Sequence, residues 1–150
     1  MIKKRNQLRG LLSELNSTVL FDEPMNKHTS FRIGGPAEAM VFPRDEKDMS
    51  KIIHIARVEK IPLFVLGKGS NLLVGDKGLH GIVVSLSSNL SGECFRQIVK
   101  TKELNSMVYL YAGAGVALTR LLRFTMQNGL SGLEFTAGIP GSLGGAVIMN

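Results

Sequence analysis

Glycine is concentrated in two short stretches of this 150-residue chain, and both have the composition of a ligand-binding loop. The first stretch, Gly67-Lys68-Gly69-Ser70-Asn71, directly follows the apolar run 62–66. Glycine permits the backbone bend that turns consecutive N–H groups toward an anion, and Ser70 and Asn71 add side-chain donors. This loop is therefore suited to a pyrophosphate group.

The second stretch, residues 138–150, places four glycines and a proline within one apolar segment. Ile139 and Pro140 are rigid enough to hold a flat ring by packing, while neighbouring amides can bond to the polar edge of that ring. Glycine also removes the Cβ that would keep such a ligand at a distance. A tight crossing beneath a helix is the alternative without a ligand. The two stretches together suggest a dinucleotide-like cofactor.

Neither glycine pair meets a standard nucleotide-binding fingerprint. The loop at 67–71 lacks the P-loop pattern, and Leu72 stands where the dinucleotide fingerprint needs its third glycine. Gly113-Ala114-Gly115 fails in the same way because Leu118 takes that position. For the loop at 67–71 taken alone, a simple tight turn stays open as an alternative.

The charge balance favours an anionic ligand. The chain carries 18 basic and 12 acidic residues, a formal charge of +6, which would attract polyanions. The basic residues are scattered apart from 3–5, and the few aromatic residues form no stacking platform, so we expect no nucleic-acid binding. No apolar run reaches the length of a membrane span, and no signal peptide is evident. We therefore expect a soluble cytoplasmic protein whose charge serves a nucleotide cofactor and a phosphorylated substrate.

Other reactive side chains are assigned structural roles. Cys94 is the single cysteine, so no intrachain disulfide can form, and we expect it in a surface strand. Asp22-Glu23 is interpreted as a solvated loop pair, and Glu134 as a brace for the glycine segment. We expect no metal site, since the histidines share no ligand spacing: they are His28, His54 and His80.

Hydrophobic periodicity predicts a helix over 3–15, then a parallel strand–helix–strand unit over 39–66. Its helix, 46–59, begins after the N-cap Asp45 and has an apolar stripe of Met49, Ile52, Ile53 and Ala56. The continuous apolar strand 63–66 is expected to be covered on both faces. The glycine loop then lies at its carboxyl end, where open α/β sheets bind ligands.

The character of the chain changes after about residue 80. A strand is expected over 81–86, followed by an antiparallel pair over 95–100 and 107–112. A helix over 117–127 follows, with Gly129 at its C-terminal end. A parallel portion thus precedes a mixed or antiparallel portion.

Three motifs carry a family resemblance, and they occur in the family's order and at its intervals. They are Thr29–Gly35, Leu66–Leu72, and Gly132–Phe135 followed by Gly138–Ala146. The chain resembles the N-terminal half of the UDP-N-acetylenolpyruvoylglucosamine reductase family. The resemblance implies an α+β fold, the two-subdomain FAD-binding fold of the vanillyl-alcohol oxidase/PCMH type, truncated at its C-terminal end. It divides the chain into an N-terminal helix (1–20), a first FAD-binding subdomain (21–80) and an incomplete second one (81–150), with no substrate-binding domain.

The resemblance also implies the cofactor sites. Gly67, Lys68, Gly69, Ser70 and Asn71 would hold the FAD pyrophosphate. The isoalloxazine would be lined by Gly138, Ile139, Pro140, Gly141, Gly144, Gly145 and Ala146.

The family uses NADPH to reduce FAD, and the flavin passes hydride to the enolpyruvyl double bond of a nucleotide sugar, giving UDP-N-acetylmuramate for peptidoglycan. Its catalytic arginine, glutamate and serine or cysteine lie beyond the position of Asn150. We therefore expect no catalytic residue in this chain and no turnover by the polypeptide alone.

Two alternatives stay open. The chain could belong to another flavoprotein of the same fold, such as an oxidase, although the loop at 67–71 offers no histidine or cysteine for a covalent flavin link. It could also be a non-catalytic nucleotide-binding module or a degenerate gene product.

Overall fold

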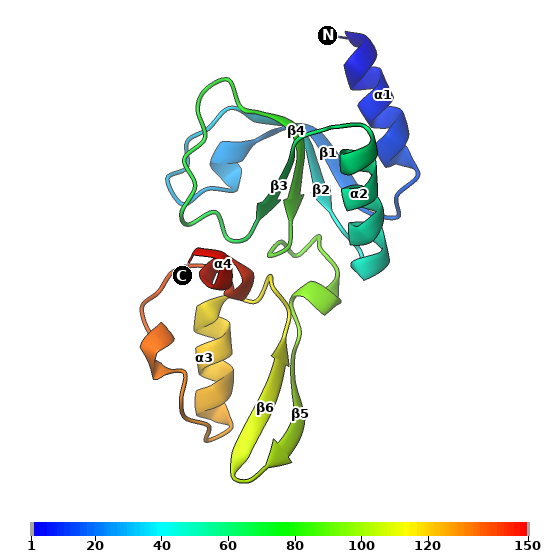
Figure 1. The fold of residues 1–150 in the computed structure, drawn as a ribbon. Helices are drawn as coiled ribbons and strands as arrows, with labels where there is room; N and C mark the ends of the chain where they lie inside the picture. Colours follow the sequence, from blue (N-terminus) through cyan, green and yellow to red (C-terminus); the bar gives the residue numbers. More distant parts are fainter. Residues whose placement is uncertain (1, 150) are drawn as a thin grey trace.

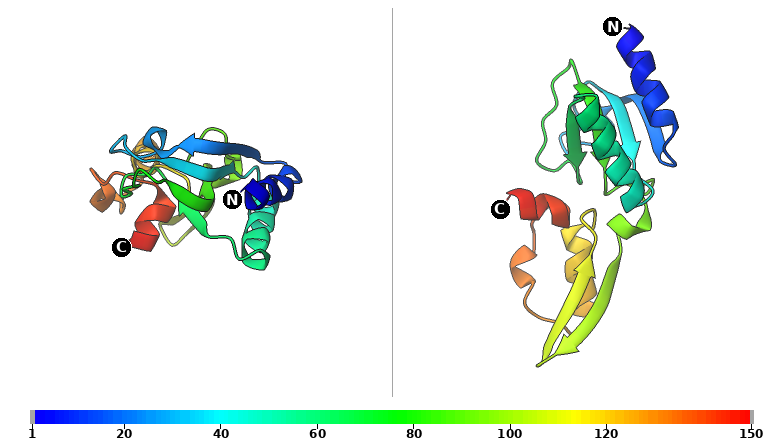
Figure 2. Two further views of the ribbon diagram at one scale, coloured as in Figure 1. Left: turned by 90° about the horizontal axis from the view of Figure 1, so that it is seen from above. Right: turned by 45° about the vertical axis from the view of Figure 1, so that its right-hand side comes forward.

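The computed structural model describes residues 2–149, with side chains from residue 6 onward, so Met1 and Asn150 lie outside the described residues. Two sheets follow one another along an elongated molecule (Figures 1 and 2). The strands are β1 (Thr18–Pro24), β2 (Pro36–Phe42), β3 (Leu63–Leu66), β4 (Leu79–Ser85), β5 (Ile98–Leu104) and β6 (Met107–Ala112). The helices are α1 (Ile2–Ser13), α2 (Glu46–Val58), α3 (Leu118–Gln127) and α4 (Leu143–Met149), with short 3-10 turns η1 (Met25–Lys27), η2 (Glu93–Phe95) and η3 (Glu134–Thr136).

The first sheet has the order β1-β2-β4-β3, in which β4 is parallel to both β2 and β3, and β1 is antiparallel to β2. Alternate residues of β2 and β4 face opposite sides of the sheet. Ala39 and Ile82 pack under α1 and α2, while Met40 and Val83 pack under loops. One face is therefore covered by helices, and the other by the irregular segments that carry the glycine motifs.

The parallel unit β2–α2–β3 is present, but β4 lies between its two strands. The expectation that 63–66 is covered on both faces is wrong, because β3 is an edge strand with Phe64 45% and Val65 58% exposed. The central position belongs to β4, whose Ile82, Val83 and Val84 are all buried. Four apolar residues in a row therefore did not distinguish an edge strand from a central one.

Local capping rules hold for α2. The Asp45 carboxylate accepts a hydrogen bond from the Asp48 amide at 2.8 Å, which confirms the predicted N-cap. The apolar stripe was predicted one residue too wide: Ile52 and Ala56 are buried, but Ile53 is 46% exposed and Ile55 contacts the core instead.

Residues 18–24 were not predicted as a strand, yet they form β1. The predicted loop pair is wrong, since Asp22 and Glu23 lie in this strand. Asp22 has φ 57°, which is unusual for a strand residue. Pairing with β2 on both sides of Asp22, over 18–21 and 23–24, outweighs this irregularity.

The second part of the chain begins after β4. The expected subdomain limit at residues 80 and 81 falls within the bounds of β4, which pairs in the first sheet through Leu79 and residues 82–85. The antiparallel pair is confirmed, but its first strand was placed too early, since β5 spans Ile98–Leu104 and not 95–100. The two strands are joined by the turn Asn105-Ser106, which has positive φ at both residues, as a type I′ turn requires. Helix α3 buries Leu118, Leu121 and Thr125, and Gly129 follows it with φ 63°.

Within residues 2–149, no helix is both long and apolar enough to cross a lipid bilayer.

The exposure difference on α2 gives a test of the fold. We expect Ile52→Ala to lower the free energy of unfolding by about 2–5 kcal/mol, because it leaves a cavity under the sheet. Ile53→Ala, one residue away on the same helix, should cost less than about 1 kcal/mol. Urea unfolding of both variants measures these losses of stability. Equal losses for the two variants would contradict the placement of α2.

Candidate functional site

The loop at 67–71 lies at the carboxyl end of β3, as expected. Gly69 is buried with φ 64°, whereas Lys68 and Asn71 are exposed. Among the hydrogen bonds of the described residues, none has a backbone N–H of residues 67–71 as its donor. Successive unpaired amides in a bent loop form the type of concavity that binds anions.

The segment at 138–146 begins as an exposed loop and ends as a helix. Gly138, Ile139 and Pro140 are exposed, and Ser142 is buried and forms an isolated antiparallel bridge with Ala117. The sequence-based interpretation of a continuous apolar loop is wrong from Leu143 onward, where α4 begins. The Ser142 hydroxyl accepts a hydrogen bond from the Gly145 amide at 3.3 Å, which satisfies one of the free amides at the start of this helix.

The fold brings these two motifs into contact although they are 70 residues apart in the sequence. The Ser70 hydroxyl donates a hydrogen bond to the Pro140 carbonyl at 3.3 Å. Gly67 lies against the Ser142 hydroxyl, and there is no room for a Cβ between them. Figure 1 shows α4 beside the end of β3, between the two sheets. The predicted pyrophosphate loop and the predicted ring-binding segment therefore form one continuous surface.

Most glycines in these motifs serve contacts within the protein, not space for a ligand. A Cβ on Gly69 would overlap the His28 carbonyl oxygen, and one on Gly144 would lie 2.9 Å from the Ala114 Cβ. Gly138 is different, because it has φ 79° and no atom within 4 Å of its Cβ position. Of the predicted glycine positions, Gly138 is thus the one where open space and a positive φ coincide.

Two further segments border this surface and were not included among the predicted site residues. The Ser30 amide donates to the Gly69 carbonyl at 3.0 Å, and the Gly144 amide donates to the Ala114 carbonyl at 2.8 Å. Phe31 and Ile33, next to Ser30, are 63% and 53% exposed. The available signals were the motif Thr29–Gly35 and the glycine pair around Ala114, neither of which fits a nucleotide-binding fingerprint.

Glu23 is the centre of a charged cluster near the loop. Its Oε1 atom accepts from His28 Nε2 at 3.0 Å and lies 3.4 Å from Lys27 Nζ. Burial would raise the pKa of Glu23, but the hydrogen bonds and positive charge of His28 and Lys27 outweigh it and hold the pKa below its ordinary value.

Cys94 and Glu134 have structural contacts. Cys94 lies in η2, not in a strand as expected, packs against the core under α2, and has the pKa of its thiol raised by burial. The Glu134 carboxylate accepts from the Gly132 amide at 2.7 Å, so it braces the turn before the 138–146 segment.

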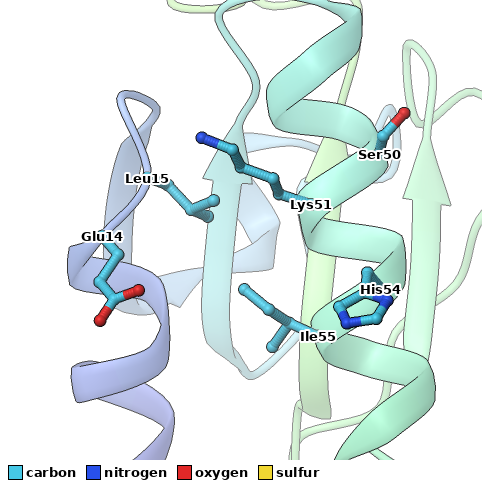
Figure 3. Close-up of a pocket in the computed structure, with 6 residues that line it drawn as sticks. All are labelled: Glu14, Leu15, Ser50, Lys51, His54 and Ile55. Atoms are coloured by element: carbon cyan, nitrogen blue, oxygen red, sulfur yellow. The ribbon is translucent and has the colours of Figure 1, made fainter.

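A cavity of about 540 Å³ lies elsewhere, between the end of α1 and α2. Glu14 and Leu15 line it on one side, and α2 residues including Lys51 and His54 line it on the other (Figure 3). Because α2 covers the sheet face opposite the glycine motifs, this cavity is separate from the candidate site.

The close approach at Gly69 generates a prediction. Gly69→Ala should lower the free energy of unfolding by about 2 kcal/mol or more, because the new Cβ strains the positive φ and meets the His28 carbonyl. Gly75→Ala is the matched control, with nothing within 4 Å of its Cβ position. Its stability should change by less than about 1 kcal/mol. Similar losses in urea unfolding would contradict the contact.

The Glu23 cluster predicts a pH dependence of stability. The pKa of Glu23 is lower in the folded chain than its ordinary value of 4.5, so the stabilisation is complete above pH 4.5 and is lost as the pH falls through the folded pKa. We expect the wild-type chain to be more stable than Glu23→Gln at about pH 7, and this difference to shrink toward about pH 3. A difference in urea unfolding that grows on acidification would contradict the cluster.

Comparison with known proteins adds to this geometry. Residues 37–150 match the FAD binding domain family. UDP-N-acetylenolpyruvoylglucosamine reductases from Heliobacterium modesticaldum and Agathobacter rectalis are each 47% identical to the chain, over 85% and 88% of its length. The chain spans only 38% and 42% of those two proteins.

A solved structure gives the same result. The UDP-N-acetylenolpyruvylglucosamine reductase of Thermus caldophilus superposes with a TM-score of 0.63 at 31% identity, covering 89% of this chain and 41% of that one. The chain therefore belongs to the FAD binding domain family, has an α+β fold, and is homologous to the N-terminal FAD-binding portion of UDP-N-acetylenolpyruvoylglucosamine reductase.

Proposed function

We propose that this chain is the FAD-binding portion of a reductase that acts on UDP-N-acetylenolpyruvoylglucosamine. The observation that carries the proposal is the contact between the loop at 67–71, with its unpaired amides, and the exposed segment 138–140. One surface thus offers donors for a diphosphate beside an apolar, glycine-containing face for a ring. Two relatives that are 47% identical to the chain are named as reductases of this nucleotide sugar.

Residues 67–71 bind the pyrophosphate in this proposal. Backbone amides hold the phosphate oxygens, and Lys68 adds a positive charge from its exposed position. Ser70 contributes by its hydrogen bond to Pro140, which holds the phosphate loop and the ring segment in register.

Residues 138–141 and 144–146 form the ring site. Ile139, 44% exposed, supplies an apolar contact, and Gly138 leaves its surroundings free of side-chain atoms. The start of α4, held against Ala114, keeps Gly144 and Gly145 in place. These residues orient the ring and keep water from one of its faces.

The flavin, when bound, supplies hydride transfer from NADPH to the enolpyruvyl double bond. The product is UDP-N-acetylmuramate, a cytoplasmic precursor of peptidoglycan. We assign no proton donor or catalytic residue to residues 1–150, whose part in the reaction is to bind and orient the cofactor.

The proposal predicts a preference for the dinucleotide. FAD should bind at least about tenfold more tightly than riboflavin, because riboflavin has the same ring but no phosphate for residues 67–71. Flavin fluorescence titration of the purified chain with both compounds measures this ratio. Equal affinities would exclude the loop as a pyrophosphate site.

Two variants locate the ring. Ile139→Asp should weaken the binding of FAD and of riboflavin by similar factors, because it places a charge against the ring. Ile53→Asp on α2 introduces the same charge at a site of similar exposure, 46% against 44%, and should change neither affinity. Unchanged binding by Ile139→Asp would place the ring elsewhere.

A further inference from the structure

The loop at 67–71 is held by residues 28–30 as well as by the 138–142 segment. The Ser30 amide donates to the Gly69 carbonyl at 3.0 Å, and the His28 carbonyl lies so close to Gly69 that a Cβ would overlap it. Residues 28–30 therefore determine where the centre of the loop lies.

The side chain of His28 ties this segment to strand β1. Its Nε2 atom is 3.0 Å from Glu23 Oε1, and an ionised carboxylate can only accept, so Nε2 carries the hydrogen. Both side chains are largely buried, with exposed fractions of 21% for His28 and 15% for Glu23. Lys27 is 62% exposed, and solvent screens its contribution to the cluster.

The backbone between these two residues is short and hydrogen-bonded. The turn η1 closes with a bond from the His28 amide to the Met25 carbonyl at 2.9 Å, and the His28 ring lies against Phe42, with ring centroids 6.3 Å apart. With its ring held by Glu23 and Phe42, the backbone of His28 has little freedom to move its carbonyl away from Gly69.

We propose that Glu23 and His28 are positioning residues for the pyrophosphate of FAD. Their hydrogen bond sets the His28 carbonyl and the Ser30 amide, which in turn hold Gly69 so that the amides of 67–71 converge on one anion. The inference rests on the proposed function, because it assigns these residues to the same FAD site.

The experiment compares four variants of the full chain: Glu23→Ala, His28→Ala, His28→Gln and the control Glu38→Ala. Glu38 is a matched choice because its carboxylate also lies near a histidine, 3.9 Å from His80 Nδ1, and accepts from the Gly81 amide. Among the described residues it makes no hydrogen bond or ion pair with the loop at 67–71. Glutamine at position 28 retains a donor with the reach of Nε2.

Two quantities are measured below the unfolding temperature of every variant: the FAD dissociation constant and the hydrogen exchange of the Ser30 amide without FAD. Glu23→Ala and His28→Ala should weaken FAD by about tenfold or more, the size expected for one charge-assisted hydrogen bond. The same variants should speed Ser30 exchange by a similar factor. His28→Gln should keep both FAD affinity and Ser30 exchange close to the wild-type values. Glu38→Ala should change neither FAD affinity nor Ser30 exchange.

The positioning role would be overturned if FAD affinity and Ser30 exchange changed only in proportion to the loss of overall stability. In that case Glu38→Ala would weaken FAD binding and speed exchange as much as Glu23→Ala does. Failure of the wild-type chain to bind FAD would overturn the proposed function instead. The Ser30 exchange, which needs no cofactor, would then still show whether Glu23 and His28 set the position of Gly69.

Discussion

The close backbone contact at Gly69 is the constraint on which the candidate site depends. Residues 28–30 can meet the loop at 67–71 only because Gly69 has no Cβ and adopts φ 64°. Any other residue would strain the backbone and separate the two segments. Within residues 2–149 the amides of the loop donate no hydrogen bond to the protein, whereas the Gly69 carbonyl accepts one from Ser30.

The first sheet supplies the framework for this contact. Helices α1 and α2 cover one face, which leaves the other face to the irregular segments around Met25 and Val74. Met25 is fully buried there, and the Met25 amide donates to the Gly35 carbonyl at 3.1 Å. A face covered by loops places many backbone groups near the carboxyl ends of the strands, where open α/β sheets bind their ligands.

The second part of the chain completes the surface by crossing back to the first sheet. The bridge between Ala117 and Ser142 joins the start of α3 to the start of α4, and Gly144 lets α4 contact Ala114. The predicted phosphate loop and the predicted ring segment thus come from different parts of the chain. A hydrogen bond between Ser70 and Pro140 joins the two.

Local rules in the sequence by themselves determined the capped helix after Asp45, the antiparallel pairing that ends at Ala112, helix α3 and the two glycine motifs. Capping and short-range periodicity are encoded within a few residues. Only the tertiary structure decided that β4 displaces β3 to the edge, that β1 forms despite Asp22, and that the glycines at 69 and 144 serve contacts within the protein. These features depend on contacts between segments that are far apart in the sequence. A local sequence pattern does not show which of those contacts form.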